Sequence, residues 1–491
     1  MFSFPWSSRP PTPPPEGMRC IPCSGQDLVV RDLVVTTGFI INMRLDAKAL
    51  EQSLTKLVQN RFPRAGARLA LRNGVYEFQV PLTFDSTTRP IAFTVEDFAE
   101  PYAQAGDRPP LPTNLAADLS EPFVCATPPL HGYFKSSTCP SALEGFLVPN
   151  TPLTHLHVAL FDDITFIGIT STHIAFDALG TSTLLHAWTR LLNGETIDAI
   201  PGMDWDAAPF EAFQKPTTVT HQRGWFNLGL FGQLFFIVLF VWGLIRDPKE
   251  EQRIVRVPKS FLEERKREIM EELKSQGSSE YVGSSDILLA WWFKTLCSVR
   301  KTGDSTLVHI HMPINLREKR IFPGDSIMGT PYINNSVAAI AIPPIPIRAF
   351  QTASLGELAL RIRCAVLAYN ADIEGIKQDV HWRFMNPFVE HFPCPPGAEY
   401  TFQTNWRSAK FGDLDFSGAR ASRSAVEKGV DEAKVRTRVL LAVGYALSTK
   451  QLPMRGAGGM FMEDDDAVWT FQIRGQKEWA KIRRSGRVAF V

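Results

Sequence analysis

An uncharged run of 21 residues, Trp225 to Ile245, occupies the middle of the chain and restricts how its two halves can be arranged. Arg223 and Arg246 flank the run, and a helix needs about 20 apolar residues to cross a bilayer. Apolar side chains on every face of a helix suit lipid better than a two-layer protein core. Three glycines and two side-chain amides weaken a spanning interpretation, so a buried core helix is the alternative.

The charge balance of the 491-residue chain argues against a nucleic-acid partner. It has 52 Lys and Arg against 51 Asp and Glu, a formal net charge of +1, and no long basic run. The 44% hydrophobic and 21% charged fractions are those of a globular protein. Seven cysteines are too sparse for a disulfide-stapled scaffold, so we interpret Cys20 and Cys23 as reduced thiols of an intracellular protein, without a second pair to complete a zinc site.

Composition and length suggest a tail, two domains and a connection. Residues 1–19 are rich in proline and lack the apolar core of a signal peptide, so we expect a disordered tail. Residues 20–215 and 251–491 form two serial blocks of strand and helix patterns, joined by a connection over 216–250 that contains the apolar run. Because the blocks lack βαβ regularity, they favour an α+β fold over a doubly wound sheet.

Periodicity and capping residues predict the individual elements. Asp46 is a suitable N-cap and Pro63 a stop for an amphipathic helix, and Ser260 with Glu263 has the spacing of a capping box. Residues 100–154 are expected to be mostly loop. The expected strands cover 32–42, 75–80, 155–161, 164–169, 254–257, 306–312, 332–342 and 401–406, and the expected helices 47–62, 178–192, 260–277, 287–299 (capped by 284–286) and 355–369.

His173 and Asp177 form a His-x-x-x-Asp sequence where the predicted strand over 164–169 gives way to a helix. An imidazole at a strand end can be held rigidly and still be reached by a substrate, as a general base requires. A core histidine beside a helix-capping Asp177 is the alternative, and on spacing alone it is the more frequent arrangement.

Other sequences that carry chemistry are missing or incomplete. No Gly-x-Ser-x-Gly elbow, phosphate-binding glycine loop or His-Glu-x-x-His sequence occurs. Gly456–Gly459 is interpreted as a flexible turn. His155/His157 and His309/His311 alternate along strands, but no carboxylate or thiol at a suitable distance supports a metal site.

Short segments in both blocks follow one another in an order that points to a single family. They are Gly38–Asn42 with Leu45–Leu50, Thr172–Asp177, Ser284–Trp291, Asn315–Arg317, Tyr332–Asn335, Leu355–Ala359, Thr404–Trp406 and Asp415–Ala419. Together, over about residues 27 to 485, they resemble the BAHD-type acyl-CoA-dependent acyltransferases, and within them fungal enzymes of secondary metabolism such as those that acetylate trichothecenes. Ala178 replaces the glycine that follows the family's His-x-x-x-Asp.

This resemblance implies an α+β fold of two pseudo-symmetric chloramphenicol-acetyltransferase-like domains with mixed sheets and a tunnel between them. Acyl-CoA would enter from one side and an alcohol from the other, with His173 between them. An imidazole with a pKa of about 6.5 can take the hydroxyl proton and pass it to the leaving thiolate. Asp177 would pair with Arg317 and fix the loop that presents His173, without forming a relay.

The resemblance also implies roles along the tunnel. No cofactor would be held permanently, since acyl-CoA, most simply acetyl-CoA, is the co-substrate, and the acceptor would be a lipophilic secondary metabolite such as a terpenoid. Thr404 or Asn405 would stabilise the oxyanion. The residues expected to bind or shape the CoA end are Ser284, Ser285, Arg407, Asp415 and Gly418.

Two other functions fit the same fold. One is a condensation-like domain, which normally has two adjacent histidines, but Thr172 takes the first position here. The other is a non-catalytic membrane-bound binding protein. If the chain is an acyltransferase, a spanning helix at 225–245 would separate His173 from Arg317. The run must then enter and leave on one face of a membrane, or pack on the protein. We expect a monomer in the cytosol or on the cytoplasmic face of an internal membrane.

Overall fold

The computed structural model describes residues 12–104, 108–115, 120–214, 218–219, 221–325, 327–386, 389, 391–421, 436–448 and 453–491. Of the expected tail, residues 1–11 lie outside this part of the chain, and Met18 and Arg19 already belong to the first strand.

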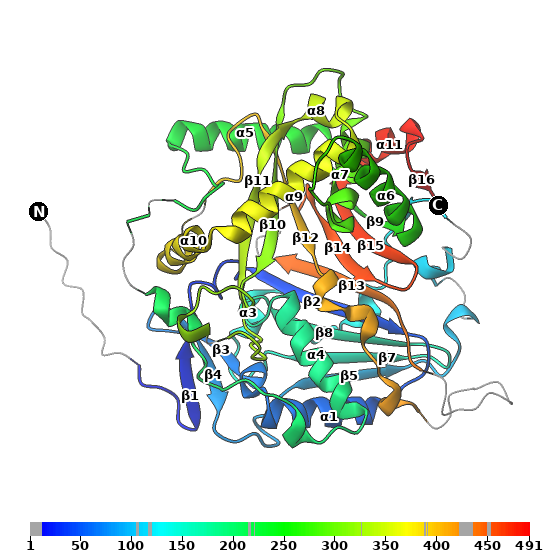
Figure 1. Ribbon diagram of the computed structural model, residues 1–491. Coiled ribbons are helices and arrows are strands. Elements are labelled where there is room, and N and C mark those ends of the chain that lie inside the picture. Colours follow the sequence, from blue (N-terminus) through cyan, green and yellow to red (C-terminus); the bar gives the residue numbers. More distant parts are fainter. Residues whose placement is uncertain are drawn as a thin grey trace, which may run out of the picture.

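Three sheets organise the described chain (Figure 1). The strands are β1 (Met18–Pro22), β2 (Leu33–Ile41), β3 (Arg68–Arg72), β4 (Val75–Pro81), β5 (Ala92–Asp97), β6 (Phe123–Ala126), β7 (His155–Leu160), β8 (Thr165–Thr172), β9 (Glu250–Pro258), β10 (Leu307–Asn315), β11 (Val337–Pro346), β12 (Glu399–Asn405), β13 (Val439–Ser448), β14 (Ala457–Glu463), β15 (Ala467–Gly475) and β16 (Ala489–Phe490). They form a sheet β1-β4-β3, a sheet β13-β2-β8-β7-β5 and a larger sheet β11-β10-β12-β14-β15-β9-β6-β16. The two larger sheets are mixed, as expected for the α+β fold.

The two halves of the chain exchange one strand each. β6 comes from the first half but pairs with β9 in the eight-stranded sheet, and β13 comes from the second half but pairs antiparallel with β2. Neither half can therefore complete its own sheet. The division of the sequence at 216–250 stays a prediction about domains.

Helices cover these sheets in two groups. In Figure 1, α1 and α4 lie against the five-stranded sheet, and α6, α7 and α9 against the larger one. The helices are α1 (Ala47–Asn60), α2 (His131–Phe134), α3 (Leu143–Phe146), α4 (Ala178–Leu192), α5 (Leu230–Arg246), α6 (Lys259–Ser275), α7 (Ser284–Cys297), α8 (Ile347–Thr352), α9 (Leu355–Ala371), α10 (Ile373–Met385) and α11 (Gln476–Ser485).

Where a helix combines a capping side chain with an apolar stripe, the sequence predicts it well. The Asp46 carboxylate accepts hydrogen bonds from the backbone N–H groups of Lys48 and Ala49, at 2.8 and 3.1 Å. Leu50 and Leu54 then bury the stripe of α1 against the five-stranded sheet.

Several local predictions are wrong. The helix α6 begins at Lys259 behind Pro258, so Ser260 is not its cap. Residues 332–336 are not a strand, because β11 begins at Val337. The described part of 100–154 is mostly loop, as expected, between short elements that include β6, α2 and α3. Gly456–Gly459 is not a turn: three of these residues enter β14, where their small size permits close approach of β12 and β15.

The apolar run forms the 17-residue helix α5, which lies at the outer edge of the molecule (Figure 1). None of its residues is buried, so the alternative of a core helix is wrong. Within the part of the chain that the structure describes, no helix has both the length and the apolarity needed to cross a membrane.

Candidate active site

His173 follows the last residue of β8 and lines a large cavity. Its backbone N–H donates a hydrogen bond to the Leu33 carbonyl at 2.8 Å, which continues the pairing of β8 with β2 past the end of the strand. The side chain is half-buried and borders a cavity of about 1860 Å³. Burial lowers the pKa of His173 below its usual 6.5, opposed by weaker contributions that include the charge of Asp177. The imidazole is therefore neutral at pH 7, as a proton acceptor must be.

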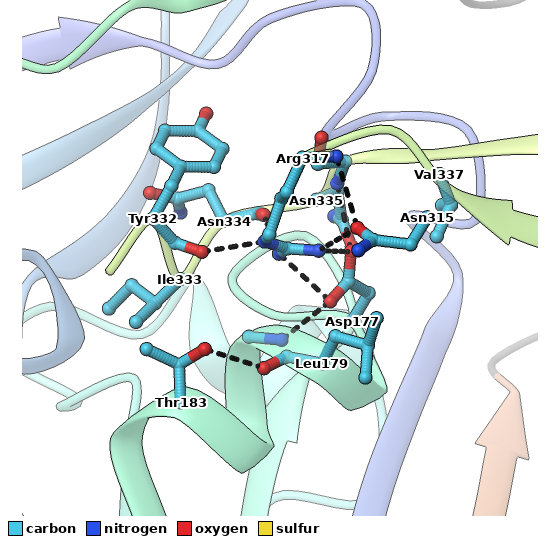
Figure 2. Close-up of polar contacts among 12 residues, drawn as sticks. Asp177, Leu179, Thr183, Asn315, Arg317, Tyr332, Ile333, Asn334, Asn335 and Val337 are labelled. Atoms are coloured by element: carbon cyan, nitrogen blue, oxygen red, sulfur yellow. Dashed lines mark hydrogen bonds and ion pairs between the residues drawn. The ribbon is translucent and has the colours of Figure 1, made fainter. Parts of the chain in front are cut away.

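Asp177 turns toward Arg317 and forms the predicted ion pair (Figure 2). Two guanidinium nitrogens donate to the two carboxylate oxygens at 3.0 Å each. The carboxylate also accepts from the backbone N–H groups of Gly180, at 2.7 Å, and Ser336, at 2.8 Å. Asp177 thus caps α4 and binds Arg317 at once. Among the described residues, its hydrogen-bond partners do not include the His173 ring.

The Arg317 guanidinium has further acceptors that make its burial tolerable. It is 8% exposed, and it donates to the Tyr332 carbonyl at 2.7 Å and to the Asn334 carbonyl at 2.6 Å (Figure 2). A buried charge is costly unless such groups replace water. Arg317 therefore joins the His173–Asp177 loop to the segment that precedes β11.

Two amides that the sequence-derived site omits fix the same loop. Asn335 donates from its side chain to the His173 carbonyl at 2.6 Å and to the Ile174 carbonyl at 3.2 Å. Asn334 donates to the Ala175 carbonyl at 2.9 Å. The sequence shows the two adjacent asparagines in Tyr332–Asn335, but it could not predict their partners, which lie more than 150 residues away.

The predicted CoA-end residues Ser284, Ser285 and Arg407 come together. Arg407 donates from one guanidinium nitrogen to the Ser284 hydroxyl at 2.9 Å and to the Ser285 hydroxyl at 2.8 Å. The prediction that the serines cap α7 is wrong. Gly283 is the N-cap, and Asp286 accepts its N–H at 2.9 Å, so both serines lie in the first turn with hydroxyls that reach Arg407.

Thr404 and Asn405 end β12 and line the same cavity as His173. The Asn405 amide donates to the Ser285 hydroxyl at 3.3 Å, and its carbonyl oxygen accepts the Arg407 N–H at 3.0 Å. The two predicted ends of the reaction path therefore border one continuous space.

Asp415 and Gly418, which were expected to shape the CoA end, are not among the residues that line the cavity. The Asn193 amide donates to the Asp415 carbonyl at 2.8 Å and accepts the Gly418 N–H at 2.9 Å. They hold the C-terminal end of α4, the opposite end from Asp177. A Cβ atom on Gly418 would lie 1.9 Å from the Leu192 carbonyl, which explains the glycine.

The histidine pair His309/His311 packs against aromatic rings. His309 contacts the Phe226 ring at 5.4 Å, and His311 lies against Trp225, with its Nε2 atom 2.9 Å from the Pro393 carbonyl. Among the described residues, no group of three metal-binding side chains is found.

Relatives among known proteins match most of the chain, although no family model matches it. It is 26% identical to the acetyltransferase adrJ of Penicillium rubens over 443 residues, covering 87% of this chain and 86% of adrJ. It is 24% identical to the O-acyltransferase pboC of Aspergillus ustus over 459 residues, covering 89% and 92%. Another relative at 24% identity, over 85% of this chain and 86% of its own, carries the name transcriptional regulator calD, from Penicillium decumbens.

Solved structures share the fold. TRI101 of F. sporotrichioides, in complex with coenzyme A and T-2, has a TM-score of 0.62 at 12% identity and covers 95% of this chain and 97% of its own. Vinorine synthase has a TM-score of 0.55 at 16% identity, with coverage of 96% and 93%. The relatives named as acetyltransferase and O-acyltransferase, together with the shared fold of two mixed sheets, match the acyltransferase family that the sequence resembles.

Proposed function

We propose that the chain moves an acyl group, most simply acetyl, from acyl-CoA to a hydroxyl of a lipophilic secondary metabolite such as a terpenoid, with His173 as general base. One observation carries this proposal. A neutral imidazole borders a large cavity, while the neighbouring carboxylate of Asp177 is bound to Arg317. His173 is therefore available to a substrate proton.

The reaction needs no covalent intermediate. His173 accepts the hydroxyl proton as the acceptor oxygen attacks the thioester carbonyl, and a tetrahedral oxyanion forms. The Thr404 hydroxyl or the Asn405 amide donates a hydrogen bond to it. When the C–S bond breaks, the protonated imidazole returns its proton to the CoA sulfur. The products are the ester, CoA and neutral His173.

The cysteines support this direct transfer. All seven are free, and burial raises the pKa of every thiol. A thiol is a poor nucleophile unless its pKa is lowered. Within the described chain, none of the residues that line the cavity is a cysteine.

The polar end of the cavity suits CoA. Ser285, Asn405 and Arg407 line it, and Ser284 completes the group at the N-terminus of α7. Phosphates bind well where a guanidinium, hydroxyls and helix N–H groups converge. Asp415 and Gly418 would act on this site only through α4.

The other walls of the cavity suit a lipophilic acceptor. They include Val35, Phe176, Met312, Ile340 and Phe402. We further propose that the protein is a monomer in the cytosol or on the cytoplasmic face of an internal membrane, attached through the apolar run.

Transfer of labelled acetyl from acetyl-CoA to a panel of terpenoid and other alcohols tests the function. His173→Ala should lower turnover by about 10²–10⁴, while CoA binding by calorimetry is kept. Turnover above about a hundredth of wild type would reject His173 as the base.

A non-catalytic binding protein is the second candidate, because two relatives are named as transcriptional regulators. Ligand binding without any acyl transfer across the panel would favour it. A condensation-like domain would require an amine acceptor on a carrier protein, and transfer to a free alcohol would reject it.

A further inference from the structure

The outer face of α5 gathers large apolar side chains that are exposed. All of the 17 residues of this helix are at least partly accessible. Its large exposed side chains are between 44% and 87% accessible: Leu230, Phe231, Leu234, Phe235, Ile237, Val238, Val241, Trp242 and Ile245. Contiguous apolar patches on a soluble protein mark surfaces that meet a partner.

The opposite side of α5 rests on the protein. Phe236 packs edge-on against Phe392 at 4.9 Å and lies 6.2 Å from the Tyr400 ring. The one amide of the helix, that of Gln233, donates to the Leu228 carbonyl at 2.7 Å, so its polar end is bound to the chain's own backbone. The exposed face therefore offers no side-chain hydrogen-bonding group from Leu230 to Val241, before the indole N–H of Trp242 and the guanidinium of Arg246.

Both ends of α5 are attached to the same body of the molecule. Before the helix, Trp225 packs on His311 of β10 at 4.8 Å and on Phe402 of β12 at 5.8 Å. After it, the Arg246 carbonyl accepts the Lys477 ammonium at 2.5 Å. The helix is about 26 Å long at 1.5 Å per residue, short of a hydrocarbon core of about 30 Å. It can lie in a membrane surface but not cross it.

The residues at the C-terminal end of α5 suit lipid headgroups. The Arg246 guanidinium lies 4.9 Å over the Trp242 ring, and Lys249 and Lys477 are exposed beside it. Of the nearby acids, Asp247 is held by the backbone N–H groups of Lys477 and Glu478. Tryptophan and cations together are typical of the level of the headgroups.

We propose that α5 is an in-plane membrane anchor whose occupant is a lipid bilayer, and that it opens the catalytic cavity toward that bilayer. A protein partner would need hydrogen-bonding groups at about one per 100–200 Å² of interface, and this face has none along most of its length. A bilayer surface needs none.

The cavity of His173 reaches this anchor. Leu244 of α5 lines it together with Trp225 and Pro248 on the two flanking segments. A lipophilic acceptor that leaves the bilayer beside α5 would thus enter the same cavity that His173 lines. This route rests on the proposed function, whereas membrane binding itself does not.

Flotation of the full chain with phosphatidylcholine vesicles, with and without phosphatidylserine, tests the anchor. The triple variant Phe231→Gln, Phe235→Gln, Val238→Gln removes lipid-facing groups only. Its matched control is Leu71→Gln, Val75→Gln, Leu82→Gln, which changes three apolar side chains that are 49–53% exposed around β3 and β4. Wild type and control should float, more strongly with phosphatidylserine, and the triple α5 variant should lose at least tenfold of the bound fraction.

Equal flotation of both triple variants, or none for wild type, would overturn the proposal. So would a wild-type dimer in gel filtration that the α5 variant abolishes without any vesicle binding, because a second copy would then be the occupant. Flotation is measured in the absence of acyl-CoA and acceptor, so it does not depend on acyl transfer. A chain that floats but transfers no acyl group therefore rejects the proposed function and supports the anchor.

Discussion

The loop that presents His173 buries charged side chains, whereas the helix α5 exposes large apolar ones. Around Asp177 and Arg317, charged groups are 4% and 8% exposed. On α5, Phe231 is 87% exposed although it is a phenylalanine. In the first region the buried charges have partners of matching geometry, and in the second the exposed face carries no charged side chain before Arg246. Each exception costs stability in water.

The difference also concerns rigidity. The loop is held by hydrogen bonds from Asn334, Asn335 and Arg317, which come from a distant segment, so its position depends on the whole fold. The helix α5 makes few contacts of its own and depends on its flanks. We therefore expect a substitution in the loop to affect the stability of the whole fold, and a substitution on α5 to affect only that helix.

The largest effect on stability is expected for Arg317→Met. This change leaves the buried Asp177 carboxylate without its cation and should lower the free energy of unfolding by about 3–5 kcal/mol in urea denaturation. The double variant Asp177→Asn, Arg317→Met should recover part of the loss. A single variant within about 1 kcal/mol of wild type would show that the pair does not hold the loop.

Asn335→Ala should lower kcat/KM by about tenfold to a hundredfold, because the His173 and Ile174 carbonyls lose their donor and the imidazole moves. Asn193→Ala is the matched control: its amide also bridges two segments, at the far end of α4. If both variants lose rate equally, Asn335 has no special part in positioning His173.

Gly180→Ala tests how tightly the start of α4 packs against the segment before β11. A Cβ atom there would lie 1.8 Å from the Ile333 carbonyl, so α4 and the segment before β11 must separate. We expect a loss of about 1–3 kcal/mol in the free energy of unfolding, by denaturant titration. A loss below about 0.5 kcal/mol would mean that the loop tolerates movement.

Gly243→Ala on α5 should have the smallest effect, and of opposite sign. Its Cβ atom would meet no atom within 4 Å, and alanine favours a helix by about 0.5–1 kcal/mol over glycine. Amide hydrogen exchange of α5 should slow about two- to fivefold. Faster exchange would show that the alanine side chain at position 243 disturbs contacts of α5.

How far the sequence predicts the structure differs between the same two regions. Capping by Asp46, the strands on either side of Asp162 and the Asp177–Arg317 pair follow from local patterns or from the family resemblance. The bonds of Asn334 and Asn335 do not, because nothing local indicates partners more than 150 residues away. The exchange of β6 and β13 between sheets is equally non-local. For α5, an apolar run fixes the helix but cannot tell burial from exposure.

The pH dependence of kcat/KM for acyl transfer tests the central claim most directly. Because burial lowers the pKa of His173, the neutral base persists as the pH falls. The profile should stay level from neutral pH down and decline in a single limb below pH 6.5, the ordinary value for histidine. In His173→Ala this limb should vanish from a residual rate lower by about 10²–10⁴. The same limb in His173→Ala, or a midpoint above pH 6.5 in wild type, would contradict the account.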